Sequence, residues 1–306
     1  MSEKKTMGRV FLTILTGIAI LGSIFLGIYD LRISESFVSM TASSPFLTAY
    51  ANFFDRTLFD GDRFGGQDFS YILILLSLGV YLVSYIPKMQ DKLISSRKYS
   101  GFMLAVILAL AIINRGFKVL FARARPGVVA DDPSMYSHMW NFGKLSFTEA
   151  LSHGSFTSGH TNVAIFLVVI AFISLGTKRK GIIVPVFILT IGYAILMALG
   201  RVFEGDHFLS DGFWSIIIGI LIAAWIYYGV LNIPEQEADN VPTYAKFEEF
   251  QWGILFVICF TALIAGLISI RYMFLHFLWY QPIILICSPM MAIFAWKRMK
   301  KILYIK

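Results

Sequence analysis

Ionisable side chains and small polar residues gather in three separate stretches of this sequence, each beside a long apolar run. The residues concerned are Lys118 and Arg125 in the first stretch, Ser158, Gly159 and His160 in the second, and Arg201, His207 and Asp211 in the third. Ionisable groups at the end of a membrane-length apolar segment are costly to keep there, and by default they mark function. Their chemistry is therefore the first guide to what the protein does.

The cations have the spacing expected of an anion-binding site. Lys118 and Arg125 are seven residues apart, about two turns of a helix, so we expect them on one helix face. Pro126 follows at once, and we expect it to stop that helix. A compact ammonium beside a planar, bidentate guanidinium suits a phosphate dianion. Arg201 adds a third cation from another segment.

The second and third stretches supply the other groups that phosphoryl transfer requires. The backbone N–H groups at Ser158 and Gly159, where a helix is expected to start, form a ready anion site. His207 and Asp211 are four residues apart, and a carboxylate on one imidazole nitrogen fixes the tautomer and makes the other nitrogen more nucleophilic. His160 comes from a different segment and can act as a general acid. Positioning, charge neutralisation, a nucleophile and an acid are all available for phosphoryl transfer.

The composition indicates that membrane helices position these groups. Hydrophobic residues make up 57% of the 306 residues and charged residues only 15%, whereas soluble domains are about 25% charged. A helix that crosses a bilayer needs about 20 apolar residues. Eight segments meet this requirement: residues 10–28, 69–87, 99 to about 122, 158–177, 181–200, 212–234, 252–270 and 272–296. We therefore predict an all-α, polytopic membrane bundle of eight spans.

The distribution of Lys and Arg predicts how the bundle lies in the membrane. Basic clusters occur at residues 4–9, 88–98, 178–180, 246 and 297–306. A cytoplasmic N-terminus places all of them on the cytoplasmic side, which then holds 16 of the 26 Lys and Arg residues. Both termini are therefore predicted to be cytoplasmic, with the three polar stretches at the opposite face. A net charge of +7 distributed in this way indicates membrane topology rather than nucleic-acid binding.

Two regions outside the stretches admit more than one interpretation. Residues 30–68 form either a connector on the membrane surface or an element that covers the site and selects the headgroup. Residues 235–306 hold the last two spans, and we predict a C-terminal transmembrane hairpin with a basic cytoplasmic tail, added to a core of residues 1–234. This hairpin either simply packs on the bundle or shapes a lipid entrance or an oligomer contact.

The order and spacing of the stretches resemble the three-part signature of the type-2 phosphatidic acid phosphatases, the lipid phosphate phosphatase superfamily. Its K-x6-R-P part is matched by residues 118–126, and its P-S-G-H part by residues 157–160 except for the proline. Its S-R-x5-H-x3-D part is matched by residues 200–211, where Gly200 replaces the serine. The resemblance covers residues 100–230 and implies a six-helix core that carries the site.

The resemblance implies a role for each matching residue. His207 would be the nucleophile that forms a phosphohistidine, Asp211 would orient it, and His160 would protonate the leaving group. The phosphoryl oxygens would be bound by Lys118, Arg125, Ser158, Gly159 and Arg201. Members of the family need no metal, and we expect neither a metal nor another cofactor here.

Four neighbouring residues are candidates for supporting parts, namely Arg115, Thr157, Glu204 and Asp206. Arg115 lies one turn before the lysine of the signature, where it either pairs with an acid in the bundle or supports the phosphate-binding cations. Glu204 and Asp206 flank the predicted nucleophile and would either tune it or repel competing anions. Thr157, in place of the signature proline, offers a hydroxyl that can cap the following helix. Arg123 is interpreted as an interfacial anchor.

The predicted function is an integral membrane lipid phosphatase, acting at the periplasmic face of a bacterial inner membrane on a phosphomonoester or a pyrophosphate. Candidate substrates are undecaprenyl pyrophosphate, phosphatidylglycerol phosphate, phosphatidic acid and lipid A phosphates. A lipid-to-lipid phosphotransferase would share the intermediate, and an anion transporter would also use buried cations. Transporter sites lie near the bilayer midplane between repeated halves, whereas these charges cluster at one boundary. The sequence leaves the particular lipid and the oligomeric state open.

Overall fold

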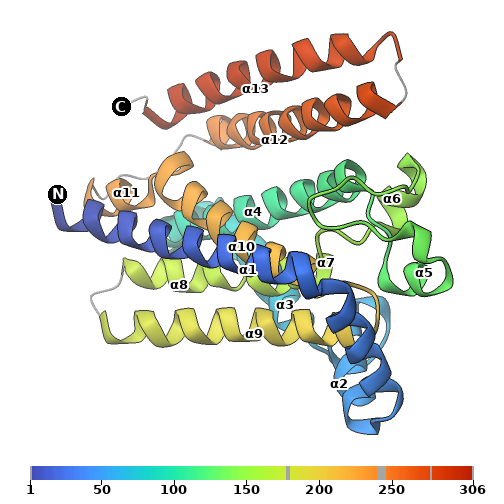
Figure 1. Ribbon diagram of the computed structural model, residues 1–306. Helices are drawn as coiled ribbons and strands as arrows, with labels where there is room; N and C mark the ends of the chain where they lie inside the picture. The colour runs from blue at the N-terminus through green and yellow to red at the C-terminus, as the bar shows by residue number, and fades with distance from the viewer. Residues whose placement is uncertain (1, 177–179, 240–245, 276–277, 305–306) are drawn as a thin grey trace.

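The computed structural model describes residues 2–176, 180–239, 246–275 and 278–304 (Figure 1). All regular secondary structure in these ranges is helical, which confirms the all-α prediction. The physical reason is that backbone N–H and C=O groups inside hydrocarbon must find their partners within the protein. Lys178, Arg179 and Lys306, which entered the orientation prediction, lie outside the described residues.

Six helices in the described part of the chain are long and apolar enough to cross a membrane. They are α1 (Ser2–Ala42), α4 (Pro87–Phe121), α9 (Ile183–Phe203), α10 (Leu209–Trp225) with its π-helical extension (Ile226–Val230), α12 (Lys246–Leu275) and α13 (Gln281–Tyr304). The other two predicted spans are shorter apolar segments, namely α3 (Asp68–Val83) and the pair α7 (Gly159–Ile165) and α8 (Val168–Leu175). The multi-pass membrane architecture is thus confirmed, with two of the eight predicted spans short.

Shorter helices lie between these spans, and local capping signals set where two of them begin. They are α2 (Pro45–Asp55), α5 (Pro126–Asp131), α6 (Phe147–His153) and α11 (Ile233–Asp239). The side chain of Ser44 caps α2, and Pro45 occupies its first turn, where a missing N–H is tolerated. Ser146 and Glu149 form a reciprocal capping box at the start of α6.

Two predicted spans have different limits in the structure. α1 continues to Ala42 instead of ending near residue 28, so Asp30 lies inside this helix and not in a loop. The span predicted over residues 158–177 is divided into α7 and α8 at Phe166 and Leu167. Both residues keep right-handed helical torsions, so the chain tightens locally and keeps its direction.

The end of α4 also differs from the prediction. The helix stops at Phe121, because Ala122 adopts the left-handed conformation with φ at 45°. Pro126 therefore does not stop α4 but occupies the first turn of α5. Arg125 lies between the two helices, so the prediction that it shares a helix face with Lys118 is wrong.

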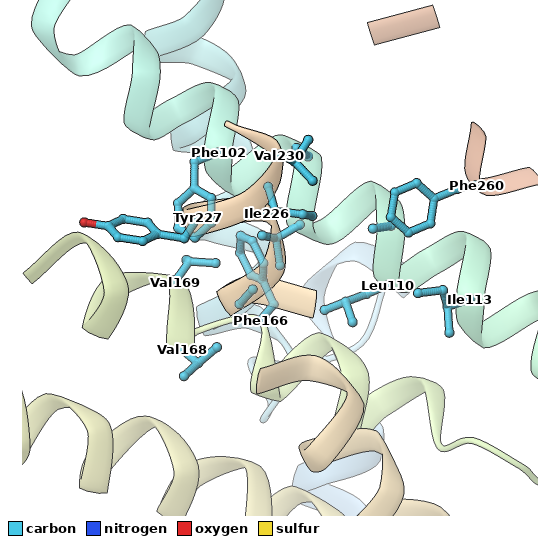
Figure 2. Packing of buried hydrophobic residues seen from close by; sticks show 14 of the residues in the cluster. Phe102, Leu110, Ile113, Phe166, Val168, Val169, Ile226, Tyr227, Val230 and Phe260 are labelled. Carbon is cyan, nitrogen blue, oxygen red and sulfur yellow. The ribbon is translucent and has the colours of Figure 1, made fainter. Parts of the chain in front are cut away.

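The interior of the bundle is filled by aromatic and branched side chains from elements far apart in the sequence (Figure 2). The ring of Tyr227, in the π-helical segment, lies 5.4 Å from that of Phe102 on α4 and 5.6 Å from that of Phe172 on α8. A Cβ atom added at Gly219 of α10 would collide with Ile165 of α7. Small residues at such crossings let helix backbones approach closely. The resulting van der Waals packing holds the helices together, because the hydrophobic effect does not drive helix association inside lipid.

The outer surface of the bundle is apolar as well. Leu21 of α1, Leu189 of α9 and Ile286 of α13 are each more than 60% exposed. Exposed apolar surface on this scale is unusual for a soluble monomer. Hydrocarbon chains of a bilayer are the medium that matches it.

The C-terminal helices α12 and α13 pair with each other, and α12 lies between α13 and the core (Figure 1). Arg271 of α12 is 2% exposed and donates hydrogen bonds to the carbonyl oxygens of Val119 and Gly143. Trp225 of α10 stacks on Trp296 of α13 with ring centroids 5.7 Å apart. The hairpin is therefore packed against the core, whereas its separation as a unit beginning at residue 235 stays a prediction.

The two ends of the bundle carry different parts of the chain. Both chain termini lie at one end, and α2, α5 and α6 lie at the other (Figure 1). This arrangement fits an even number of crossings, and it brings the loops that carry the polar stretches to one face.

Candidate active site

The three polar stretches meet at the end of the bundle that carries α2, α5 and α6. The backbone N–H of Ser158, at the start of α7, donates to the carbonyl oxygen of Asp211 on α10 at 3.4 Å. Arg125, before α5, donates through Nη1 to Asp206 Oδ2 at 2.9 Å, and Asp206 lies in the turn between α9 and α10. Segments separated by many residues thus share one site.

His207 is buried in the turn between α9 and α10, next to two polar groups. Its Nδ1 lies 3.6 Å from Oδ2 of Asp211. Ser155 Oγ donates a 2.5 Å hydrogen bond to that carboxylate oxygen and lies 3.4 Å from His207 Nδ1. The backbone N–H of Phe208 donates to the same oxygen at 2.9 Å. These contacts hold the carboxylate in place and orient Nδ1 toward it, which leaves Nε2 as the nitrogen free to react.

Ser155 was not identified from the sequence. It lies in the loop before α7, and nothing about its spacing distinguishes it from other loop serines. The only hint is its position three residues before Ser158. Its role depends on how the loop folds toward α10.

The electrostatic surroundings keep His207 neutral. Burial lowers the pKa of its imidazole, and the charges of Lys118 and Arg201 lower it further, whereas the hydrogen bond and charge of Asp211 raise it. The net direction is downward, so the ring carries no charge at neutral pH. An unprotonated nitrogen is a requirement for a nucleophilic imidazole.

Arg123 lies deep inside the protein and is not an interfacial anchor, so that prediction is wrong. Its guanidinium is 1% exposed and donates to Asp30 Oδ2 and to Asp211 Oδ1, both at 2.8 Å. Its Nε donates to the carbonyl oxygen of Ser137 at 3.0 Å, and its charge lies 3.9 Å from the ring centre of Phe208. The physical reason for burial is that two carboxylates compensate one cation where water is excluded.

The outer part of the site pairs three partly exposed acids with two arginines, of which Arg201 is buried and Arg125 is partly exposed. Arg201 contacts the carboxylates of Asp55, Glu204 and Asp206. Asp206 also bridges to Arg125. Glu204 and Asp206, predicted either to tune His207 or to repel anions, thus lie on the cations that were predicted to bind phosphate.

These two acids have opposite pKa shifts. Burial raises the pKa of Glu204 to about 7, and the nearby carboxylates of Asp55 and Asp206 raise it as well, against the pull of Arg201. Burial also works to raise the pKa of Asp206, but Arg201 and Arg125 outweigh it and hold that pKa below its ordinary value. Asp206 is therefore a permanent charge at neutral pH, whereas Glu204 titrates there.

His160, at the start of α7, faces a carboxylate from the long segment before α3. Its Nε2 lies 3.5 Å from Oδ1 of Asp55, the last residue of α2. The segment of residues 30–68 thus reaches the site through Asp55, whereas the prediction that it covers the site and selects the headgroup stays a prediction. Asp55 is a further site residue that sequence spacing did not reveal.

Lys118 is buried near the end of α4 and faces the site without a carboxylate contact. Within the described residues no ion-pair or hydrogen-bond partner is found for its ammonium group. Arg125 and Arg115 lie within electrostatic range of it. Arg115 does not pair with an acid in the described chain, and donates to the carbonyl oxygen of Leu151 at 3.1 Å instead.

The signature residues at the start of α7 have mainly local contacts. Ser158 is the capping residue of this helix, and its Oγ accepts from Thr161 Oγ1 at 2.9 Å. Thr157 is not the cap, contrary to the prediction, because its hydroxyl accepts instead from Asn114 Nδ2 at 3.1 Å. Gly159 follows the cap, so its backbone N–H belongs to the first turn of the helix.

The glycine that replaces the signature serine has a steric explanation. Gly200 of α9 packs directly beneath α2, and a Cβ atom added there would lie 2.8 Å from Cβ of Phe54. A serine at this position would force α2 outward. α2 carries Asp55, so the substitution by glycine is coupled to the contact between Asp55 and His160.

No group of three or more His, Cys, Asp and Glu side chains in the described part of the chain is arranged to hold a metal ion. Searches of curated proteins and of solved structures found no match to the chain. Residues 100–234 match the model of the PAP2 superfamily, a range that begins on α4 and contains all three polar stretches. The match indicates phosphatase-type activity on phosphate esters. It confirms the resemblance drawn from the three stretches, because residues 100–234 of the chain are similar to the PAP2 superfamily.

Proposed function

We propose that the protein is a membrane lipid phosphatase that hydrolyses a phosphomonoester or pyrophosphate bond through a phosphohistidine on His207. The observation that carries this proposal is the pairing of a buried, neutral imidazole with Asp211 and Ser155, 3.6 Å and 3.4 Å from Nδ1. This arrangement presents Nε2 to a site surrounded by cations. A nucleophile that is oriented and unprotonated in this way needs no further activation.

In the first step, the Nε2 lone pair of His207 attacks phosphorus and forms a P–N bond. The bond from phosphorus to the lipid oxygen, or to the leaving phosphate of a pyrophosphate, breaks and its electron pair stays on that oxygen. His160 donates a proton to this oxygen as general acid. Asp211 stabilises the positive charge that develops on the imidazole ring.

In the second step, water replaces the lipid product. His160, now unprotonated, accepts a proton from the water as its oxygen attacks phosphorus, and the P–N bond breaks. Inorganic phosphate leaves and both histidines return to their starting states, so the cycle consumes one water for each bond hydrolysed. Asp55, 3.5 Å from His160 Nε2, is placed to stabilise the protonated form of this histidine.

We assign the phosphoryl oxygens to Lys118, Arg125 and Arg201, with the backbone N–H groups that follow Ser158. Asp206 and Glu204 contact the arginines when no substrate is bound. A phosphate dianion must therefore exchange with these carboxylates. Lys118 has no such competitor in the described chain, so it is proposed as the cation that binds phosphate without displacing a carboxylate.

The proposed substrate is a lipid because the site lies at one end of a bundle with an apolar outer surface. A lipid substrate keeps its chains in the bilayer while its headgroup reaches the cations. Undecaprenyl pyrophosphate, phosphatidylglycerol phosphate, phosphatidic acid and lipid A phosphates all meet this description. The proposal covers a phosphomonoester or a pyrophosphate of this class.

The proposed location is a bacterial inner membrane with both chain ends in the cytoplasm and the site facing the periplasm. This orientation rests on the excess of Lys and Arg on one side. It is compatible with the position of both termini at the end opposite α5 and α6 (Figure 1). A cysteine-accessibility measurement on intact cells, with single cysteines placed at residues 60 and 297, tests it directly.

The proposed function is tested by phosphate release from phosphatidic acid, phosphatidylglycerol phosphate and undecaprenyl pyrophosphate in detergent micelles. We expect His207→Ala to lower the rate by at least about a thousandfold, because the variant lacks the imidazole that takes up the phosphoryl group. His138→Ala, at an exposed histidine beside Tyr136, is the matched control and should keep the wild-type rate.

Two outcomes would count against the proposal. Phosphate release that is unchanged in the His207→Ala protein would rule out the phosphohistidine. Transfer of the labelled phosphoryl group to a second lipid, without release of inorganic phosphate, would identify a phosphotransferase with the same intermediate. Acid-quenched wild-type protein should also contain acid-labile, protein-bound phosphate that the variant lacks.

A further inference from the structure

One cation lies between two carboxylates in the interior behind His207. Asp30, Arg123 and Asp211 are at most 2% exposed. They come from α1, from the segment after α4 and from α10, and both ion pairs have N–O distances of 2.8 Å. With all three groups ionised, the arrangement carries one net negative charge. Asp30 lies outside residues 100–234, the range of the family match.

Asp30 also holds the first turn of α10. Its Oδ1 accepts from the backbone N–H of Ser210 at 2.9 Å, and its Oδ2 accepts from the hydroxyl of Ser210 at 2.5 Å. Ser210 immediately precedes Asp211. The carboxylate of α1 therefore reaches both the guanidinium and the residue next to Asp211.

The charge balance shows what Asp30 adds. Arg123 and Asp211 alone would form a neutral pair, and the negative charge of Asp211 would be compensated before it could act on His207. Buried charges are not screened by water, so this compensation is strong. Asp30 compensates Arg123 from the other side and restores a net negative charge beside the imidazole.

We propose that Asp30 is a positioning residue that neutralises Arg123, so that the charge of Asp211 remains available to stabilise the positive imidazole formed when His207 is phosphorylated. This inference rests on the proposed function, because it needs His207 to be the nucleophile. It assigns the first membrane-spanning helix a part in catalysis in addition to packing.

The other groups around His207 make this negative charge necessary. Positive charge on the ring is opposed by Lys118 and Arg201 and supported by Asp211. The groups that face or influence the ring are Asp211 of α10, Ser155 of the loop before α7, His160 of α7, Lys118 of α4, Arg201 of α9 and Asp206 of the turn before α10. Two cationic side chains therefore act on the imidazole, and the net negative charge behind it offsets them.

The test uses the full chain in micelles, with whichever lipid of the panel the wild type hydrolyses fastest. Asp30→Asn keeps the size of the side chain and removes its charge, and we expect kcat to fall about tenfold with KM changed less than about twofold. The acid limb of the kcat/KM profile should move to lower pH, because His207 becomes harder to protonate. Arg123→Gln should move this limb to higher pH.

The decisive comparison is the double variant Asp30→Asn/Arg123→Gln. It restores one net negative charge, so its kcat should exceed that of Asp30→Asn by at least about threefold. A purely structural role for Asp30 predicts the opposite, since losing both partners would leave the double variant less active than either single one. A double variant less active than both, or an acid limb that does not move in either single variant, overturns the inference.

Controls separate charge from folding and from the proposed function itself. Ser210→Ala removes a contact of Asp30 without changing any charge, and its acid limb should stay at the wild-type pH. The thermal midpoint of each purified variant reports whether it folds. If Asp30→Asn does not fold, the inference is tested by Arg123→Gln alone, through the pH at which the acid limb of its kcat/KM profile lies. An active His207→Ala protein would contradict the proposed function. If His207→Ala is inactive but Asp30→Asn is fully active, the proposed function stands and only the role of Asp30 is contradicted.

Discussion

The site contains two charged regions, an inner one behind His207 and an outer one around Arg201, and their carboxylates differ in their access to water. The inner region contains Asp30, Arg123 and Asp211, with side chains at most 2% exposed. In the outer region, the carboxylates of Asp55, Glu204 and Asp206 are 30–46% exposed and contact Arg125, which is 26% exposed, or Arg201, which is 2% exposed. Both regions pair carboxylates with arginine, yet only the outer pairs can be replaced by solvent or by a ligand.

The comparison shows that carboxylate–arginine pairs serve two different purposes, depending on whether the carboxylate is buried. An inner pair that loses one partner leaves an uncompensated buried charge, which costs about 3–5 kcal/mol, so these pairs fix geometry and charge. In each outer pair the carboxylate is partly exposed to water, so it can leave the arginine without becoming a buried, uncompensated charge, and a phosphate can take its place. The inner region is therefore suited to holding the nucleophile and the outer region to exchanging anions.

The largest expected difference between the regions comes from neutralising one acid in each. Asp211→Asn should lower kcat by about a thousandfold or more, because the imidazole loses both its orientation and its counter-charge. Asp206→Asn, five residues earlier and in the outer region, is the matched variant and should change kcat less than about tenfold. Steady-state phosphate release from the fastest lipid of the panel measures both. Similar losses in the two variants would contradict the division.

A smaller effect is expected from the hydroxyl that links His207 to Asp211. Ser155→Ala removes the 2.5 Å hydrogen bond to the carboxylate, so kcat should fall about tenfold while the thermal midpoint changes little. Ser152→Ala is the control, since this exposed hydroxyl donates only to the carbonyl oxygen of Thr148. Equal activity in the two proteins would show that Ser155 does not support Asp211 in catalysis.

The smallest expected effect is the pH dependence of anion exchange in the outer region. Glu204, with its pKa raised to about 7 by burial, is neutral below that pH and ionised above it. As the pH rises from 6 to 8, its growing negative charge competes more strongly with phosphate for Arg201. Inhibition by inorganic phosphate should therefore weaken about two- to threefold more in the wild type than in Glu204→Gln.

Phosphate itself titrates between pH 6 and 8, but this affects the wild type and Glu204→Gln equally, so the ratio of their inhibition constants reports Glu204 alone. Inhibition constants measured at intervals between pH 6 and 8 supply the two curves. Parallel curves would show that Glu204 does not compete with phosphate at Arg201.

The sequence by itself determined the membrane class, the helical fold and the three polar stretches. These are local properties: apolar runs of membrane length, and the fixed spacing of residues 118–126, 157–160 and 200–211. An apolar segment of membrane length is stable in the bilayer whatever its neighbours are, so the segment alone suffices to predict a span. The family match over residues 100–234 agrees with this local information.

Tertiary structure alone decided which charges distant in the sequence became partners. Arg123 pairs with Asp30, 93 positions away, and Ser155 reaches Asp211 across 56 positions. The end of α4 at Phe121 separated Lys118 from Arg125, although their spacing had placed them on one face. The physical reason is that the value of a buried charge depends on the nearest opposite charge, and only the packing of helices brings that charge within reach.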